Sequence, residues 1–185
     1  WPQNKALDAM AGNVFVGRQR ERGELKAGLE EALSGRGRLM TLVGEPGIGK
    51  TRTSQELATY ATLRGAQVLW GRCYDSQGVP PCWQWVQAIR SYVQERDTED
   101  LRSVMGSGAS DIAEIVGDVR SKLGDLEKPQ DLDPEQARFR LFDSTTNFFR
   151  PSSRNQPNVP FLDDLHWAAT PSLLLLEFMA RELRG

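Results

Sequence analysis

One stretch of eight residues limits what this chain can fold into more than any other part of it. The stretch is Gly44, Glu45, Pro46, Gly47, Ile48, Gly49, Lys50 and Thr51, and it matches the pattern G-x-x-x-x-G-K-[ST] at every defined position. Its glycines carry no Cβ atoms, so successive backbone N–H groups can point at the phosphates of a nucleotide. Lys50 is expected to reach the β- and γ-phosphates, and the Thr51 hydroxyl is expected to bind Mg²⁺. The sequence therefore predicts that all eight residues form a nucleotide-binding loop.

The segments on both sides of this loop predict an α/β fold. Residues 39–43 (LMTLV) have the composition of a buried strand, and residues 67–71 (QVLWG) that of a second one. Between them, Leu57, Ala58 and Ala61 share one face of a helix. A strand, a helix and another strand in so short a span form a parallel unit with a right-handed crossover. The predicted fold is a P-loop NTPase with a parallel sheet between helices, a three-layer α/β/α arrangement.

A second candidate half of the site lies more than one hundred residues further on. Residues 158–164 (NVPFLDD) form a short apolar segment that ends in two carboxylates. Asp163 is predicted to bind Mg²⁺ together with Thr51, and Asp164 to orient or deprotonate the attacking water as the catalytic residue. Related enzymes more often use Glu there, so the shorter Asp164 predicts slow turnover. The alternative, that both aspartates only cap a turn, is less favoured because the complete loop lies upstream.

The middle of the chain is predicted to be a helical insertion at about 82–150. Asp133 and Pro134 are typical of a helix start, whereas 96–110 and 124–132 are predicted to be loops. Apolar residues recur there at helical spacing: Trp85, Val86, Ile89, Tyr92, Val93, Ile112, Ile115, Val116, Val119, Leu123, Leu141, Phe142, Phe148 and Phe149. The aromatic members could face a bound base, but core packing is the favoured interpretation. Residues 1–13 are predicted to be a linker and 14–185 the nucleotide-binding domain.

Composition narrows the classes of protein to consider. The 185 residues include 23 basic and 25 acidic side chains, so the formal net charge is −2, which gives no support to a nucleic-acid surface or a membrane anchor. Cys73, Cys82 and the single His166 are too few for a zinc site. His166 could sense a γ-phosphate, but a packed or hydrogen-bonded role is favoured. With no long apolar run and no leader sequence, the expected location is cytoplasmic.

Four segments together resemble a known family. They are Val14–Arg18, Gly44–Thr51, Val68–Tyr74 and Leu162–Ala168. They are similar to the nucleotide-binding module of the signal-transducing ATPases with numerous domains (STAND). These AAA-like P-loop proteins occur in large LuxR-type transcription regulators and beside class III nucleotidyl cyclase domains. The resemblance implies ATP or ADP with Mg²⁺ as cofactors and a switch between nucleotide states. It also implies that Val16, Gly17 and Arg18 lie near the adenine.

The resemblance also implies partners outside this segment. An effector domain downstream is expected, homo-oligomerisation is an expectation of the family, and neither nucleic acid nor membrane is expected to bind this segment directly. Because the chain begins at Trp1 and stops in a helix, we expect it to continue beyond Gly185 and to lack the later strands of its sheet. The chain departs from the family pattern at Pro160 and Ala169, and these departures concern hydrolysis more than binding.

The sequence thus predicts an ATP-binding regulatory module with slow Mg²⁺-dependent hydrolysis. The alternative is a hydrolysis-inactive interaction scaffold whose sheet is completed by a partner or a second copy. A small-molecule kinase is less favoured because nothing in the sequence resembles a substrate-binding lid.

Overall fold

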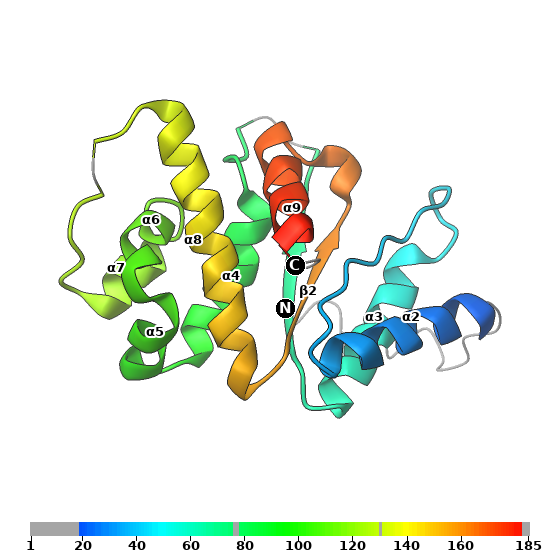
Figure 1. Cartoon of the computed structure of the whole chain (residues 1–185). Coiled ribbons are helices and arrows are strands. Elements are labelled where there is room, and N and C mark those ends of the chain that lie inside the picture. The colour runs from blue at the N-terminus through cyan, green and yellow to red at the C-terminus, as the bar shows by residue number, and fades with distance from the viewer. Residues whose placement is uncertain (1–18, 76–77, 130, 183–185) are drawn as a thin grey trace.

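Two parallel strands lie at the centre of the molecule, with helices on both sides (Figure 1). The computed structural model describes residues 19–75, 78–129 and 131–182. The strands are β1 (Gln67–Arg72) and β2 (Asn158–Asp163). The helices are α2 (Gln19–Leu33), α3 (Lys50–Leu63), α4 (Trp83–Glu95), α5 (Thr98–Met105), α6 (Ala109–Ala113), α7 (Gly117–Leu123), α8 (Pro134–Asn155) and α9 (Thr170–Glu182), with short 3₁₀ turns at Gly106–Gly108 and Leu165–Trp167.

The helices fall into two groups about the strands. In Figure 1, α2 and α3 lie on one side of the strand pair and α4 to α8 on the other. The larger hydrophobic core packs α4 to α9 together and reaches β1 at Leu69, which is fully buried. A smaller core joins α2 and α3 to the other face of the strands through Leu29, Leu57 and Phe161. This arrangement confirms the α/β class at a coarse level, because helices cover both faces of a parallel strand pair.

The register of the two strands brings their carboxyl ends to one edge. Pairing runs in parallel from Gln67 opposite Asn158 to Arg72 opposite Asp163. Pro160 in β2 lacks an N–H group, which a strand paired on both sides would miss, but β2 pairs only with β1 among the described residues. The carboxyl-terminal edge of such a pair is where parallel sheets carry their binding residues.

The prediction of a buried strand at residues 39–43 is wrong. The segment carries no strand, and no strand pairs with it in the described part of the chain. Only alternate side chains are covered: Met40 and Leu42 pack against the smaller core, whereas Leu39 is 51% and Val43 86% exposed. A buried strand needs partners for its backbone groups and cover on both faces, and this segment has cover on one face only.

The prediction of a loop at 96–110 is also wrong, because α5 and a 3₁₀ turn occupy most of this segment. The Asp97 side chain caps α5 by accepting a hydrogen bond from the backbone N–H of Asp100 at 2.9 Å. Leu101 and Met105, four residues apart, are buried on one face. The predicted helical stretch 82–150 is otherwise occupied by α4 to α8, and α8 runs on to Asn155.

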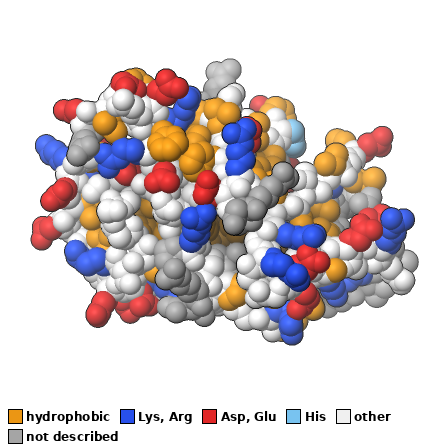
Figure 2. Space-filling view, viewed as in Figure 1, with side chains coloured by type: hydrophobic (Ala, Val, Ile, Leu, Met, Phe, Trp, Pro, Cys, Tyr) orange, Lys and Arg blue, Asp and Glu red, His pale blue; other side chains and the backbone are white. Residues whose placement is uncertain are grey.

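An apolar groove lies on the surface of the described part of the chain. It lies between α8 and α9 and is lined by Phe139, Phe142, Leu174 and Phe178 with charged residues around them; Phe139 is 60% exposed. Figure 2 shows hydrophobic side chains on this face among basic and acidic ones. None of the helices in the described ranges is both long enough and apolar enough to span a bilayer.

Candidate functional site

The loop at residues 44–51 leads directly into α3. Gly47 has φ 77° and Gly49 has φ 95°, the left-handed region that side chains disfavour. Gly49 is the N-cap of α3 and offers no side-chain cap, so the first N–H groups of this helix remain available to an anion in front of it. The two glycines therefore do here what the sequence motif requires of them.

Lys50 crosses back over the loop. Its ammonium Nζ donates hydrogen bonds to the backbone carbonyls of Gly44 at 2.8 Å and Glu45 at 3.0 Å. An ammonium has three N–H donors, and the third has no acceptor among the described residues. Two contacts thus hold the positive charge at the loop, and the remaining donor is left for a ligand.

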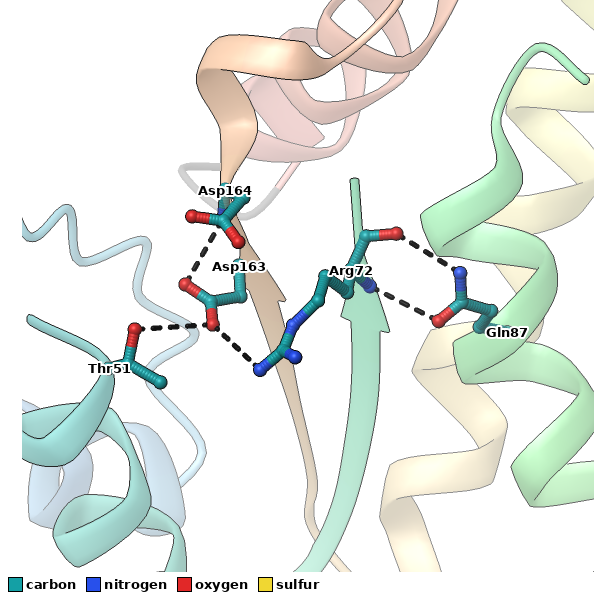
Figure 3. A network of polar contacts seen from close by, with 5 residues as sticks. All are labelled: Thr51, Arg72, Gln87, Asp163 and Asp164. Atoms are coloured by element: carbon teal, nitrogen blue, oxygen red, sulfur yellow. Dashed lines mark hydrogen bonds and ion pairs between the residues drawn. The ribbon is translucent and has the colours of Figure 1, made fainter. Parts of the chain in front are cut away.

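The second motif comes to the same place. The Thr51 hydroxyl lies 3.5 Å from Oδ2 of Asp163 and donates to it, across 112 residues of sequence (Figure 3). Asp163 ends β2, its side chain is 14% exposed, and its Oδ1 accepts the backbone N–H of Asp164 at 3.0 Å. The predicted metal-binding pair therefore lies within the reach of one small cation, with hydroxyl and carboxylate oxygens of the kind that Mg²⁺ prefers.

A comparison with protein families bears directly on this pair of motifs. The family model described as the AAA ATPase domain matches residues 14–185. The chain belongs to the AAA ATPase domain family. Neither the curated proteins nor the solved structures yielded a match to this chain. The AAA-like part of the resemblance is thereby confirmed, and family membership supports a nucleotide-binding function, since AAA ATPase domains generally bind ATP or ADP with Mg²⁺.

The residues present in this AAA ATPase domain fit such a ligand. Lys50, the uncapped start of α3 and the two left-handed glycines suit the phosphates. Thr51 and Asp163 would supply oxygens for Mg²⁺, and the bound ion would offset the negative charge of the phosphates. Glu45, Pro46 and Ile48 lie in the exposed loop between them. Val16, Gly17 and Arg18, predicted near the adenine, lie outside the described residues, as does the predicted linker.

Arg72 also belongs to the site, although the sequence analysis assigned it no role. Its guanidinium donates to Oδ2 of Asp163 at 3.3 Å, the oxygen that Thr51 contacts (Figure 3). Its backbone N–H and C=O are both held by the Gln87 side chain of α4, at 3.2 and 3.0 Å. The signal was present in the sequence: Arg72 ends one strand and Asp163 the other, and parallel strands that end together place these side chains side by side.

Asp164, the predicted catalytic residue, follows in an unusual conformation. Its backbone has φ 58° and ψ 40°, a left-handed geometry that Asp tolerates better than most residues. Its carbonyl accepts the N–H of Trp167 at 3.0 Å and begins the 3₁₀ turn Leu165–Trp167. The carboxylate accepts no hydrogen bond from the described residues, so it is not held in place by a partner.

Two neighbours complete the electrostatics of this edge. Burial, followed by the negative charges of Asp164 and Asp163, raises the pKa of the Cys73 thiol to about 11, so Cys73 is a neutral thiol at pH 7. Cys73 and Cys82 are both free and buried. His166, for which a packed or hydrogen-bonded role was favoured, has an exposed side chain whose ring lies 4.9 Å from the Trp167 ring between centroids.

Proposed function

We propose that this AAA ATPase domain is an ATP-binding regulatory module of a larger signalling or transcription-regulating protein. Slow Mg²⁺-dependent hydrolysis of ATP would alternate its two nucleotide states. The observation that carries the proposal is the approach of Thr51 to Asp163, because it joins the phosphate-binding loop to a carboxylate at one point. The STAND resemblance supports the regulatory role and the downstream effector domain.

The chain's own residues would divide the work as follows. Lys50 and the loop N–H groups bind and orient the phosphates, and Thr51 and Asp163 hold Mg²⁺. Asp164 orients an attacking water and accepts its proton at a carboxylate oxygen. Because that carboxylate is short and has no hydrogen-bond partner to fix it, we expect turnover to be slow.

A nucleotide titration with a matched control tests the proposal. Lys50→Ala removes an ammonium that donates to two backbone carbonyls of the loop. Lys122→Ala is the control, because the Lys122 ammonium also donates to two backbone carbonyls, those of Val93 and Gln94, away from the loop. We expect the affinity for Mg²⁺–ATP, measured by calorimetry, to fall at least tenfold in Lys50→Ala and to stay unchanged in Lys122→Ala. Equal affinities in both variants would exclude this loop as the binding site.

The second candidate is a hydrolysis-inactive interaction scaffold. The exposed apolar groove between α8 and α9 favours it, since such surfaces often make protein contacts. The long contacts of Asp163 with Thr51 and Arg72, at 3.5 and 3.3 Å, and the Asp164 carboxylate, which no hydrogen bond from the described residues holds, also favour slow or absent chemistry. Phosphate release from ATP over hours, compared between the natural chain and Asp163→Asn, separates the two functions: equal rates would favour the scaffold.

A further inference from the structure

We infer that Arg72 is a resident counter-cation of Asp163 that competes with the metal and makes metal binding depend on nucleotide. In the metal-free domain the guanidinium occupies the carboxylate oxygen that the metal needs. A bound polyphosphate offers the guanidinium another acceptor and releases that oxygen. The inference rests on the proposed function, because it concerns the same nucleotide and metal site.

The competition follows from how the two oxygens of Asp163 are used. Oδ1 accepts the N–H of Asp164 at 3.0 Å. Oδ2 accepts both the Thr51 hydroxyl at 3.5 Å and the Arg72 guanidinium at 3.3 Å. A carboxylate oxygen offers about two lone-pair positions, so a metal held by Thr51 and Asp163 would have to share Oδ2 with the guanidinium, against the repulsion between the two positive charges.

The contact is also weak enough to exchange. A charge-assisted N–H···O bond is usually about 2.7–2.9 Å long, and the one from Arg72 to Asp163 is 3.3 Å. The Arg72 side chain is 32% exposed, so solvent reaches it, whereas Asp163 is 14% exposed. An ion pair of this intermediate exposure stabilises the carboxylate only weakly, so another cation can replace the guanidinium.

The charges around Asp163 explain why a cation stays there. Asp163 and Asp164 are adjacent carboxylates, and both negative charges act on the buried thiol of Cys73, raising its pKa. Arg72 is the cation that pairs with this edge in the described part of the chain. A second cation on the same oxygen would be repelled by the guanidinium, so metal and Arg72 weaken each other's binding to Asp163.

The backbone of Arg72 is fixed, which confines the exchange to its side chain. Gln87 holds both its N–H and its C=O, and β2 lies on the opposite side of the strand. Just before it, Gly71 packs so closely on α4 that an added Cβ would lie 2.1 Å from the Gln84 carbonyl oxygen. A planar guanidinium on a fixed backbone is suited to move from a carboxylate to a phosphate, since it can bind either through two N–H groups.

Metal binding by the nucleotide-free domain tests the competition. Mn²⁺ replaces Mg²⁺ as the probe because its binding can be followed by electron paramagnetic resonance. We expect Arg72→Gln to bind Mn²⁺ about fivefold more tightly than the natural chain, the effect of removing one partly exposed competing ion pair. Arg90→Gln is the matched control, since Arg90 is 35% exposed and pairs with Asp118 far from the loop; its Mn²⁺ affinity should equal that of the natural chain. Asp163→Asn should abolish the binding.

The second measurement is the affinity for ADP without metal, followed with a fluorescent ADP. Here Arg72→Gln should bind about tenfold more weakly, because the phosphates lose a guanidinium. If Arg72 had a purely structural role, Arg72→Gln would lower the affinities for Mn²⁺ and for ADP together. If Arg72 competes with the metal, the substitution raises the affinity for Mn²⁺ and lowers the affinity for ADP. Unchanged or weaker Mn²⁺ binding in Arg72→Gln overturns the inference.

The outcomes separate this inference from the proposed function. If the natural chain binds Mg²⁺–ATP through Lys50 but Arg72→Gln leaves Mn²⁺ affinity unchanged, only the inference fails. If the natural chain binds no nucleotide at all, the proposed function fails. The inference then fails too, because nucleotide can no longer draw Arg72 away from Asp163. Should Arg72→Gln not fold, Arg72→Lys decides: its shorter, single-point cation competes less, so an Mn²⁺ affinity equal to that of the natural chain overturns the inference.

Discussion

Because α4 packs closely on β1, we expect even the smallest substitution at Gly71, to alanine, to destabilise the fold strongly. A Cβ added there would lie 2.1 Å from the carbonyl oxygen of Gln84 and 2.7 Å from its carbonyl carbon, distances that real Cβ atoms do not show. Both atoms belong to the backbone near the start of α4, so no side chain can swing aside. Gly71→Ala must therefore separate α4 from β1 or bend one of them.

The expected loss of stability in Gly71→Ala can be compared with the effect of alanine at two other glycines. Overpacking a core usually costs about 1–3 kcal/mol, and an obstacle made of backbone places Gly71→Ala at the upper end, about 3 kcal/mol. For a domain of this size that corresponds to a fall in Tm of about 6–12 °C. At Gly28 an added Cβ would meet the flexible side chain of Met40, with the sulfur nearest at 2.5 Å, so we expect the free energy of unfolding to change by no more than about 1 kcal/mol.

Gly23→Ala is the control for the substitution itself. Nothing lies within 4 Å of an added Cβ at Gly23, which is in the interior of α2. Alanine should stabilise that helix by about 0.5–1 kcal/mol. Thermal and urea unfolding followed by circular dichroism measure all three variants. If Gly71→Ala were as stable as Gly23→Ala, the close contact of α4 and β1 would not exist in solution, and the placement of Arg72 beside Asp163 would lose its foundation.

Two further predictions concern the same edge of the strands. Asp164→Asn keeps a residue that tolerates the left-handed backbone at φ 58°, so ATP binding by calorimetry should persist while phosphate release falls at least tenfold; equal turnover would remove Asp164 from the mechanism. The pKa of the buried Cys73 thiol is raised from 9.0 to about 11, which means that the folded state keeps a proton that the unfolded chain has lost. This contribution is fully present below pH 9 and is lost as pH rises through 11, so urea unfolding should show the natural chain losing more stability than Cys73→Ala between those values. Parallel losses in the two proteins would contradict the assigned burial of the thiol.

The phosphate-binding loop and the start of α8 could be predicted from the sequence because each depends on residues that are close together in the chain. The loop fixes its glycines and Lys50 by the need to face a phosphate, and the structure brings its Thr51 to Asp163. Asp133 was predicted to begin a helix, and its carboxylate accepts the N–H groups of Glu135 and Gln136 at 3.0 and 2.9 Å. The parallel unit predicted from residues 39–43 and 67–71 is not found, because 39–43 carries no strand, but β1 does run parallel to its observed partner β2.

The misses have a different origin, since each depends on what lies next to the segment. Residues 39–43 are as apolar as a buried strand, yet Val43 is 86% exposed because nothing in the described chain covers that face. The helix α5 was missed because it is short, its exposed side is polar, and few of its residues face the core, namely the buried Leu101 and Met105 and the partly buried Val104. Arg72 was missed because its partner is set by strand register, and a single segment does not contain that information.

Strand register is what ties the charge pair to the hydrophobic core. Along the paired strands, Trp70 stacks on Phe161 with ring centroids 4.8 Å apart, and the next pair on that face is Arg72 with Asp163. Side chains alternate between faces along a strand, so a slip of one residue would set Gly71 opposite Asp163 and break the aromatic stack at the same time. The apolar contacts that stabilise the register therefore also determine which cation meets Asp163. Arg72 is a counter-ion placed by core packing, and substitutions that loosen the stack should alter metal binding without touching any group at the site.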